Sequence, residues 1–301
     1  MTSTATPVSA RGVPQARPAP QRRRLSWLGV LPFFVFSVLF MLLPIAFLVV
    51  GSFQDSAGRV TLQNYVDLSE PFIVEAYLTS IEISLVTAIG GGIFGFLLAY
   101  AVILGGLPSF LRTALMTFSG VASNFAGVPL ALAFIFTLGN AGLVTTFLLD
   151  TFNIDIVEGG FSLYTKLGLE LVYMYFQFPL MVLIIAPAID GLKREWREAS
   201  ENLGATPRQY WRRVALPILT PTILGTVILL FGNAFGAQAT AYQLSGGTIN
   251  LVTLVISSQI RGDVLHNVGL GYALAMGMVA IMAVSITGYT LLQRRAERWL
   301  Q

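Results

Sequence analysis

The sequence of 301 residues contains no cysteine and only one histidine, His266. Disulfides and thiolate metal sites are therefore excluded, and one histidine does not make a metal centre by itself. Charged residues are scarce too, at 11% against about 25% in ordinary soluble domains. The formal net charge of +3 is too small and too scattered to indicate a nucleic-acid partner. Long stretches carry no charge at all, so the chain lacks the polar surface of a soluble protein.

Apolar residues make up 55% of the chain, and the mean hydropathy is +0.73. A helix needs about 20 apolar residues to cross a bilayer, and six segments have that length. We therefore predict an all-α integral membrane protein with six transmembrane helices. A seventh apolar run, Ile249–Ile260, is too short and predicts a re-entrant, interfacial or short packed helix. The six predicted spans are Trp27–Val50, Ile81–Leu104, Thr113–Leu138, Leu167–Ile189, Ile218–Ala239 and Val268–Leu292.

The segment before the first span differs from the rest of the chain. Residues 1–24 are rich in proline, alanine and arginine and have almost nothing to bury, so we expect a disordered cytoplasmic tail. The six-span domain then covers residues 25–301. Its first apolar stretch is too long for a cleaved signal peptide, whose apolar core has about 7–15 residues.

Lysine and arginine indicate the side on which each loop lies, because they are retained on the cytoplasmic face of a membrane. Of the 18 Lys and Arg residues, fifteen flank the predicted spans on one side. The other side has only Arg59, Lys166 and Arg261. We therefore expect a multi-pass protein of the plasma or inner membrane, with both termini and the loop 191–213 in the cytoplasm.

The loop between the fourth and fifth predicted spans is the richest in local signals. Glu195–Leu203 mixes charged residues with apolar ones at helical spacing, which predicts a short amphipathic helix. Gly204 follows where a helix end favours positive φ, and Thr206 with Pro207 is typical of a helix start. We expect two short helices joined at a glycine elbow, with Pro217 separating the second from the fifth span. Periodicity alone fits either a surface for a protein partner or a basic face on anionic lipid.

A longer pattern runs through this loop. Glu198-Ala199-Ser200 is followed after three residues by Gly204, and after nine more by Val214-Ala215-Leu216-Pro217. The pattern resembles the cytoplasmic EAA signature of binding-protein-dependent permeases, which reads EAA, three residues, Gly, nine residues and I-x-L-P. Ser200 replaces the second alanine, and Val214 replaces the isoleucine. With the six-span frame around it, the resemblance covers nearly the whole chain after residue 25.

The resemblance implies the type I permease fold of ATP-binding-cassette (ABC) importers, with a cytoplasmic coupling helix between spans 4 and 5. This helix would insert into a groove of a cytoplasmic ATPase and pass its closing motion to the spans. The chain has no G-x-x-x-x-G-K-[ST] sequence to hold nucleotide phosphates. We therefore expect a transport subunit rather than an enzyme, with ATP and Mg²⁺ bound by the partner ATPase. The expected coupling residues are Trp196, Glu198, Ala199, Ser200, Gly204, Tyr210, Trp211, Leu216 and Pro217.

The same resemblance implies several partners. Six spans make half of a transmembrane unit, so we expect a second homologous permease and thus a heterodimer. Two cytoplasmic ATPase subunits and an extracytoplasmic substrate-binding protein complete the importer. Membrane lipid surrounds the spans.

Polar residues inside the spans are candidates for a solute pathway, because each must face protein or water rather than lipid. In the fourth span, one helical stripe carries three of them. Two acids also have structural interpretations: Glu82 in the first turn of its helix is favoured by the helix dipole, and Glu170 pairs with Lys166. The predicted pathway residues are Glu82, Glu170, Tyr173, Gln177, Asn233, Gln238 and Tyr242.

The segment 231–247, together with Phe178-Pro179, resembles the spermidine and putrescine branch of these permeases. Carboxylates and tyrosines in the spans favour a cationic amine and would repel an anion such as sulfate. A polyamine is therefore the expected solute, with iron, thiamine, phosphonate, sulfate or a sugar as alternatives in the same fold. An ion-coupled carrier or channel explains the six spans equally well but not the glycine elbow. A membrane enzyme or scaffold is disfavoured, because no catalytic cluster of His, Cys or paired acids is present.

Overall fold

The structure is a computed structural model that describes residues 30–261 and 266–297. The predicted tail, residues 1–24, and the start of the first predicted span at Trp27 lie outside the described residues. Within the described ranges every regular element is helical, and one isolated bridge pairs Gln54 with Val60. By its internal packing the chain divides into two units, one ending at Phe47 and the other beginning at Leu48.

Six helical segments of the described residues are long and apolar enough to cross a membrane, as the sequence predicts. Their bounds are close to the predicted ones except in the second, third and fifth. The six segments are Leu31–Ser52, Pro71–Leu104, Gly127–Phe152, Lys166–Asp190, Pro207–Phe235 and Val268–Leu291.

The first segment is assembled from α1 (Leu31–Ser37), a π-helical turn (Val38–Leu42) and α2 (Leu43–Ser52). The π turn comes directly before Pro44, which lacks a backbone N–H and whose ring crowds the carbonyl four residues back. A π turn widens the helix at that point and relieves the crowding. The helix therefore passes the proline without a break.

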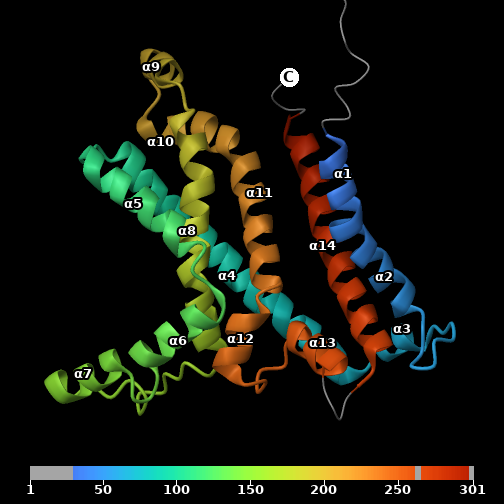
Figure 1. Cartoon of the computed structure of the whole chain (residues 1–301). Helices are drawn as coiled ribbons and strands as arrows, with labels where there is room; N and C mark the ends of the chain where they lie inside the picture. Colours follow the sequence, from blue (N-terminus) through green and yellow to red (C-terminus); the bar gives the residue numbers. More distant parts are fainter. Residues whose placement is uncertain (1–29, 262–265, 298–301) are drawn as a thin grey trace, which may run out of the picture. The chain divides into compact units, whose positions relative to one another are not determined.

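The second unit contains the remaining helices, drawn in Figure 1. α9 and α10 lie at one end of this unit, and α6, α7, α12 and α13 lie at the other. The helices are α3 (Gln63–Asp67), α4 (Pro71–Leu104), α5 (Ser109–Ala122), α6 (Gly127–Leu138), α7 (Leu143–Phe152), α8 (Lys166–Asp190), α9 (Arg194–Asn202), α10 (Pro207–Tyr210), α11 (Leu216–Phe235), α12 (Gln238–Ser245), α13 (Val252–Arg261) and α14 (Val268–Glu297).

α4 is longer than the predicted second span. It has 34 residues and begins at Pro71, ten residues before the predicted start at Ile81. Proline suits a first helical position, because its missing N–H would have no intrahelical acceptor there. Glu82 consequently lies inside the helix rather than in its first turn, so the dipole interpretation of Glu82 was wrong.

The third predicted span, Thr113–Leu138, is broken into α5 and α6. The two helices have 14 and 12 residues, which is about 21 and 18 Å at about 1.5 Å per residue, so neither alone crosses about 30 Å of hydrocarbon. Arg112 near the start of α5 pairs with Asp190 at the end of α8, whereas α6 packs against the beginning of α8. α5 and α6 together therefore make the crossing. By hydropathy alone, the third membrane span would be Gly127–Phe152. The helix is interrupted within that range, between the end of α6 at Leu138 and the start of α7 at Leu143.

The fifth predicted span, Ile218–Ala239, also differs from the structure. Its helix begins earlier, continuous with α10 from Pro207, and it ends at Phe235. Gln238 starts a separate helix, α12, after a break at Gly236 and Ala237. The short seventh run is confirmed as a short helix, α13, packed on α4 and α14.

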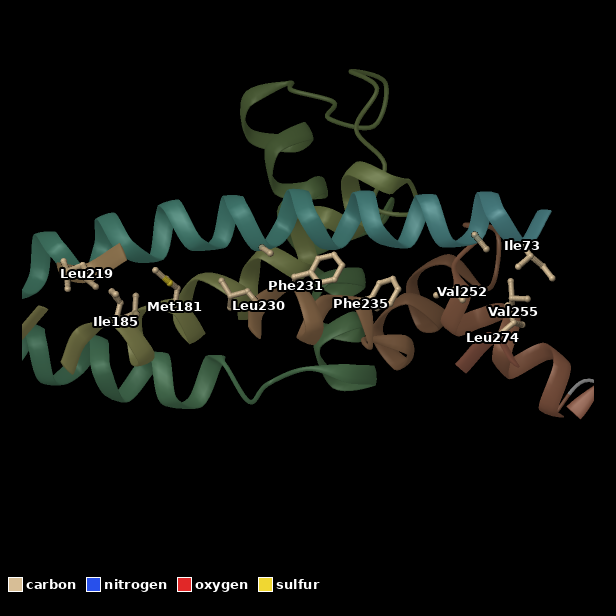
Figure 2. Packing of buried hydrophobic residues seen from close by; sticks show 14 of the residues in the cluster. Ile73, Met181, Ile185, Leu219, Leu230, Phe231, Phe235, Val252, Val255 and Leu274 are labelled. Atoms are coloured by element: carbon tan, nitrogen blue, oxygen red, sulfur yellow. The ribbon is translucent and has the colours of Figure 1, made fainter. Parts of the chain in front are cut away.

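The core of the second unit runs along α4, which packs on α8 and α11. Figure 2 shows this cluster extending along α4 from Leu219 and Ile185 to Val252 and Leu274. The helices approach closely because α4 has glycine at the contact: a Cβ on Gly95 would come within 2.5 Å of the Met181 Cβ and of the Phe178 carbonyl oxygen. Small residues allow such close packing in membrane helices, where apolar burial against lipid contributes little.

Candidate functional site

The loop 191–213 forms a sharp elbow at the Asp190 end of α8 (Figure 1). α9 ends at Asn202, and Gly204 takes a φ of +76°. This left-handed conformation lets the Ala205 N–H donate to the Ser200 carbonyl oxygen at 3.0 Å, which closes the helix end. A residue with a Cβ would be strained at Gly204, so glycine defines the turn. The predicted elbow is present at the predicted residue.

The helix after the elbow begins with a capping box. The Gln209 N–H donates to Thr206 Oγ1 at 3.3 Å, and the Thr206 N–H donates to Gln209 Oε1 at 2.8 Å. Each side chain thus satisfies a backbone donor that has no partner in the first turn. Pro207 occupies the first helical position, as predicted.

The second helix of the elbow is not a separate piece. α10 continues through a π-helical turn, Trp211–Ala215, directly into α11. The prediction that Pro217 separates a short helix from the fifth span was therefore wrong. The π turn directly precedes Leu216 and Pro217 and accommodates the proline ring, which would otherwise crowd the Arg213 carbonyl. The elbow is consequently joined to α11 by one continuous helix from Pro207 to Phe235.

α9 presents an apolar stripe at the surface, where Lys193 Nζ lies 5.7 Å from the centroid of the Trp196 ring. Trp196, Ala199 and Leu203 lie on one side of the helix and are exposed, Leu203 to 89%. Its arginines are occupied locally, with Arg194 Nε 2.8 Å from Glu198 Oε1 and Arg197 Nε 2.9 Å from Glu201 Oε1. The Glu201 carboxylate, through this hydrogen bond and its charge, raises the pKa of the Arg197 guanidinium. Paired charges and an open apolar stripe together make a surface suited to a protein partner.

Two predicted coupling residues turn inward instead. Tyr210 is buried to 7% exposure, and the Trp211 ring meets the Tyr100 ring of α4 edge to face, with centroids 4.8 Å apart. The Trp211 ring therefore fixes the start of the α10–α11 helix to α4. The surface left for a partner comes from α9. Ser200, on the same helix, donates its hydroxyl to the Arg197 carbonyl oxygen at 2.8 Å.

Two predicted pathway residues, Tyr173 and Gln177, are buried donors between helices. The Tyr173 hydroxyl donates to the Ala237 carbonyl oxygen at the break between α11 and α12. Gln177 Nε2 donates to the Leu230 carbonyl oxygen of α11 at 2.8 Å, and the residue is 0% exposed. These side chains link α8 to α11 and α12 in the structure.

The two predicted acids lie near the beginning of α8. Lys166 forms an ion pair with Glu82 of α4, not with Glu170 as the sequence suggested. The pair ties α4 to α8 at this end, as Arg112 and Asp190 tie α5 to α8 at the other. The charge of Glu82 is thus neutralised locally, which weakens the sequence argument that the spans repel anions.

A cavity lies at the end opposite the elbow. Its volume is about 730 Å³, and it is walled by α12, α13 and the segment between them, with Phe72 of α4 and Val128 of α6. Gln238 and Tyr242, both predicted pathway residues, line it, whereas Asn233 is exposed on α11 and does not. The sequence indicated these two residues but not the cavity, because the segment 238–261 forms most of its wall and is completed by Phe72 and Val128, which are distant in the sequence.

Comparison with known proteins was made at the level of sequence and of structure. No family model matches the chain. It is 30% identical to the sulfate transport system permease protein CysT of Salmonella typhimurium over 214 residues, covering 70% of this chain and 72% of the relative. It is 26% identical to the spermidine/putrescine transport system permease protein PotB of Haemophilus influenzae, covering 90% of this chain and 93% of the relative.

Solved structures show a similar fold. A bacterial ABC transporter involved in the import of the acidic polysaccharide alginate matches with a TM-score of 0.69 at 18% identity, covering 90% of this chain and 95% of that one. A second structure of the alginate transporter, in complex with its pentasaccharide-bound periplasmic protein, matches with a TM-score of 0.68 at 17% identity, covering 90% and 94%.

Proposed function

This chain belongs to the permease family of type I ABC importers, and we propose that it passes a small solute into the cytoplasm under the control of a separate ATPase. The family membership makes it a multi-pass transport subunit of the membrane. The elbow faces the cytoplasm, as the lysine and arginine distribution favours, and both termini lie on that side.

One observation carries the coupling role of the elbow: the apolar stripe of α9 is uncovered although it sits on a rigid turn. Exposed apolar side chains are unfavourably hydrated, and a groove on a partner protein would remove them from water. The helix that follows is continuous with α11, so a motion of the docked α9 reaches Phe235 without an intervening loop. A cytoplasmic ATPase subunit is the partner that the EAA resemblance implies.

The test is transport by the assembled complex with Gly204→Val. A β-branched residue at a φ of +76° costs about 1–2 kcal/mol, so the elbow should change its angle. We expect ATP-driven uptake in vesicles to fall about tenfold while the ATPase subunits still co-purify. Gly58→Val is the matched control, since Gly58 has a φ of +77° with open space around it in the loop before α3. Equal uptake by the Gly204 variant and the control would refute the coupling role.

The proposed complex contains a second homologous permease, two ATPase subunits and an extracytoplasmic binding protein. The solved alginate transporter with its periplasmic protein supports a binding protein of this kind. Mass measurement of the intact complex decides between a heterodimer, which we propose, and two copies of this chain.

For the solute, two charge classes have support. The similarity to PotB over 90% of the chain, with Glu82 and Glu170, supports a polyamine. The similarity to CysT, together with the ion pair that neutralises Glu82, supports sulfate. Labelled spermidine and labelled sulfate, each offered to vesicles with the whole complex and ATP, separate the two. Uptake that follows an ion gradient and needs no ATP would instead indicate a carrier.

A further inference from the structure

The 730 Å³ cavity opposite the elbow has an unusual balance of polar groups. Seven of its lining side chains carry hydrogen-bond donors, and three of them, Thr248, Asn250 and Ser258, donate to backbone carbonyl oxygens. The remaining four are Gln238, Tyr242, Ser257 and Arg261. None of the residues that line it has a carboxylate. The cavity therefore carries no negative charge of its own, and its one buried side-chain acceptor without a partner among the described residues is Asn250 Oδ1.

The four donors are unoccupied within the described part of the chain. Some described arginines of this unit pair with a carboxylate, among them Arg59, Arg112 and Arg194. Arg261, the last residue of α13, forms no ion pair with any described residue, and its side chain is exposed. A guanidinium prefers a bidentate oxygen acceptor, and the described residues do not provide one here.

The backbone adds to this balance. α12 begins at Gln238, and Gln238 and Ala239 both line the cavity. The first amides of a helix have no intrahelical acceptor, and the helix dipole places partial positive charge there. Donors thus come from α12 on one wall and from α13 on the other.

We infer that this cavity is an anion site, which takes a small oxyanion such as sulfate through Arg261 with Gln238, Tyr242 and Ser257 as further donors. The inference rests on the proposed function, because it places the solute at the outer end of an importer permease. The volume is large for one oxyanion, so the ion enters with part of its water shell and meets the chain through a few direct bonds. Tyr173 positions the start of α12, because its hydroxyl donates a hydrogen bond to the Ala237 carbonyl oxygen directly before that helix.

The experiment uses the complete importer in vesicles loaded with ATP, with radiolabelled sulfate outside. Arg261→Gln should raise the KM for sulfate at least tenfold while the ATPase rate without solute stays unchanged. Arg261→Lys, which keeps the charge, should recover part of that loss. Arg59→Gln is the matched control, because it removes another exposed arginine of the same predicted face that does not line the cavity. Gln238→Ala removes a donor from the opposite wall and should raise the KM as well, which keeps the test decisive should Arg261→Gln not assemble.

The outcomes separate the inference from the proposed function. An unchanged KM in the assembled Arg261 and Gln238 variants overturns the anion site. ATP-driven uptake of spermidine, with none of sulfate, thiosulfate or molybdate, also overturns it and leaves the importer standing. Absence of ATP-driven uptake for every solute in the wild-type complex overturns the proposed function itself.

Discussion

The two ends of the second unit are built in opposite ways. The elbow end is local, since Gly204 and the Thr206–Gln209 capping box lie within six residues. The cavity end is formed mainly by the segment 238–261, with α12 and α13, and Phe72 of α4 and Val128 of α6 complete it from distant parts of the sequence. A local structure keeps its shape when helices move, whereas a cavity between several helices changes with every shift among them.

This difference fits a division of work between the ends. In the proposed coupling, the elbow would move as one body and would carry motion along the continuous helix from Pro207 to Phe235. The path would end at Ala237, which directly precedes the cavity-lining Gln238. The Ala237 carbonyl oxygen accepts a hydrogen bond from the Tyr173 hydroxyl. Variants that act on the connection, on the cavity or on the elbow should therefore have distinguishable effects.

The largest effect should come from breaking the connection between the ends. Gly95→Val places a side chain where a Cβ alone would come within 2.5 Å of Met181 and of the Phe178 carbonyl. Overpacking of this kind costs about 1–3 kcal/mol and separates α4 from α8. We expect a lower thermal midpoint and a low yield of the complex by size-exclusion chromatography.

Gly120→Val is the control for that variant, because a Cβ on Gly120 of α5 meets nothing within 4 Å. Its yield should match the wild type. A normal yield and thermal midpoint for Gly95→Val would show that α4 and α8 have room for a side chain at Gly95, contrary to this geometry.

A smaller effect should follow from changing the cavity end alone. Tyr173→Phe removes the hydrogen bond to Ala237 and leaves a buried carbonyl without its partner, which costs about 1–3 kcal/mol. We expect the KM for the solute to rise several-fold while ATPase activity without solute is kept. Tyr164→Phe, at an exposed tyrosine near the same end, should leave both unchanged. A loss of ATPase activity with a normal KM would contradict the division between the ends.

The smallest effect should come from the elbow cap. Thr206→Ala removes the side-chain acceptor for the Gln209 N–H, and the loss of such a cap costs about 1 kcal/mol. Hydrogen exchange at the amides of 208–210 should accelerate about fivefold, with no change around the cavity. Thr113→Ala, which loses only a bond to the carbonyl four residues back in α5, serves as the comparison. Faster exchange at α12 in the Thr206 variant would mean that the elbow is not an independent local unit.

The same contrast explains what the sequence revealed. Gly204, Thr206 and Pro207 act through neighbours a few residues away, so their residue types predicted the elbow correctly. The six spans could be counted because each contains an apolar run long enough to cross a bilayer. Their ends were less accurate: α4 starts ten residues early because polar and apolar residues alternate there, and proline does not end the helix that contains Pro217.

Long-range partners were beyond what spacing can show. Lys166 lies four residues before Glu170, yet it pairs with Glu82, 84 residues away, because α4 packs beside α8. Tyr173 and Gln177 were identified as polar residues facing protein, but their acceptors on α11 and beyond depend on how helices meet. The cavity was missed for the same reason.

The π turn at Trp211–Ala215 has a geometric consequence for the elbow. It takes one more residue into a turn than an α-helix does, and one residue of an α-helix corresponds to about 100° of rotation. Everything before Trp211 is therefore set at a different azimuth about the axis of α11 than an unbroken α-helix would give. The direction in which α9 leaves the fifth span is thus fixed by a count of residues between Pro207 and Pro217, independent of any contact that α9 makes.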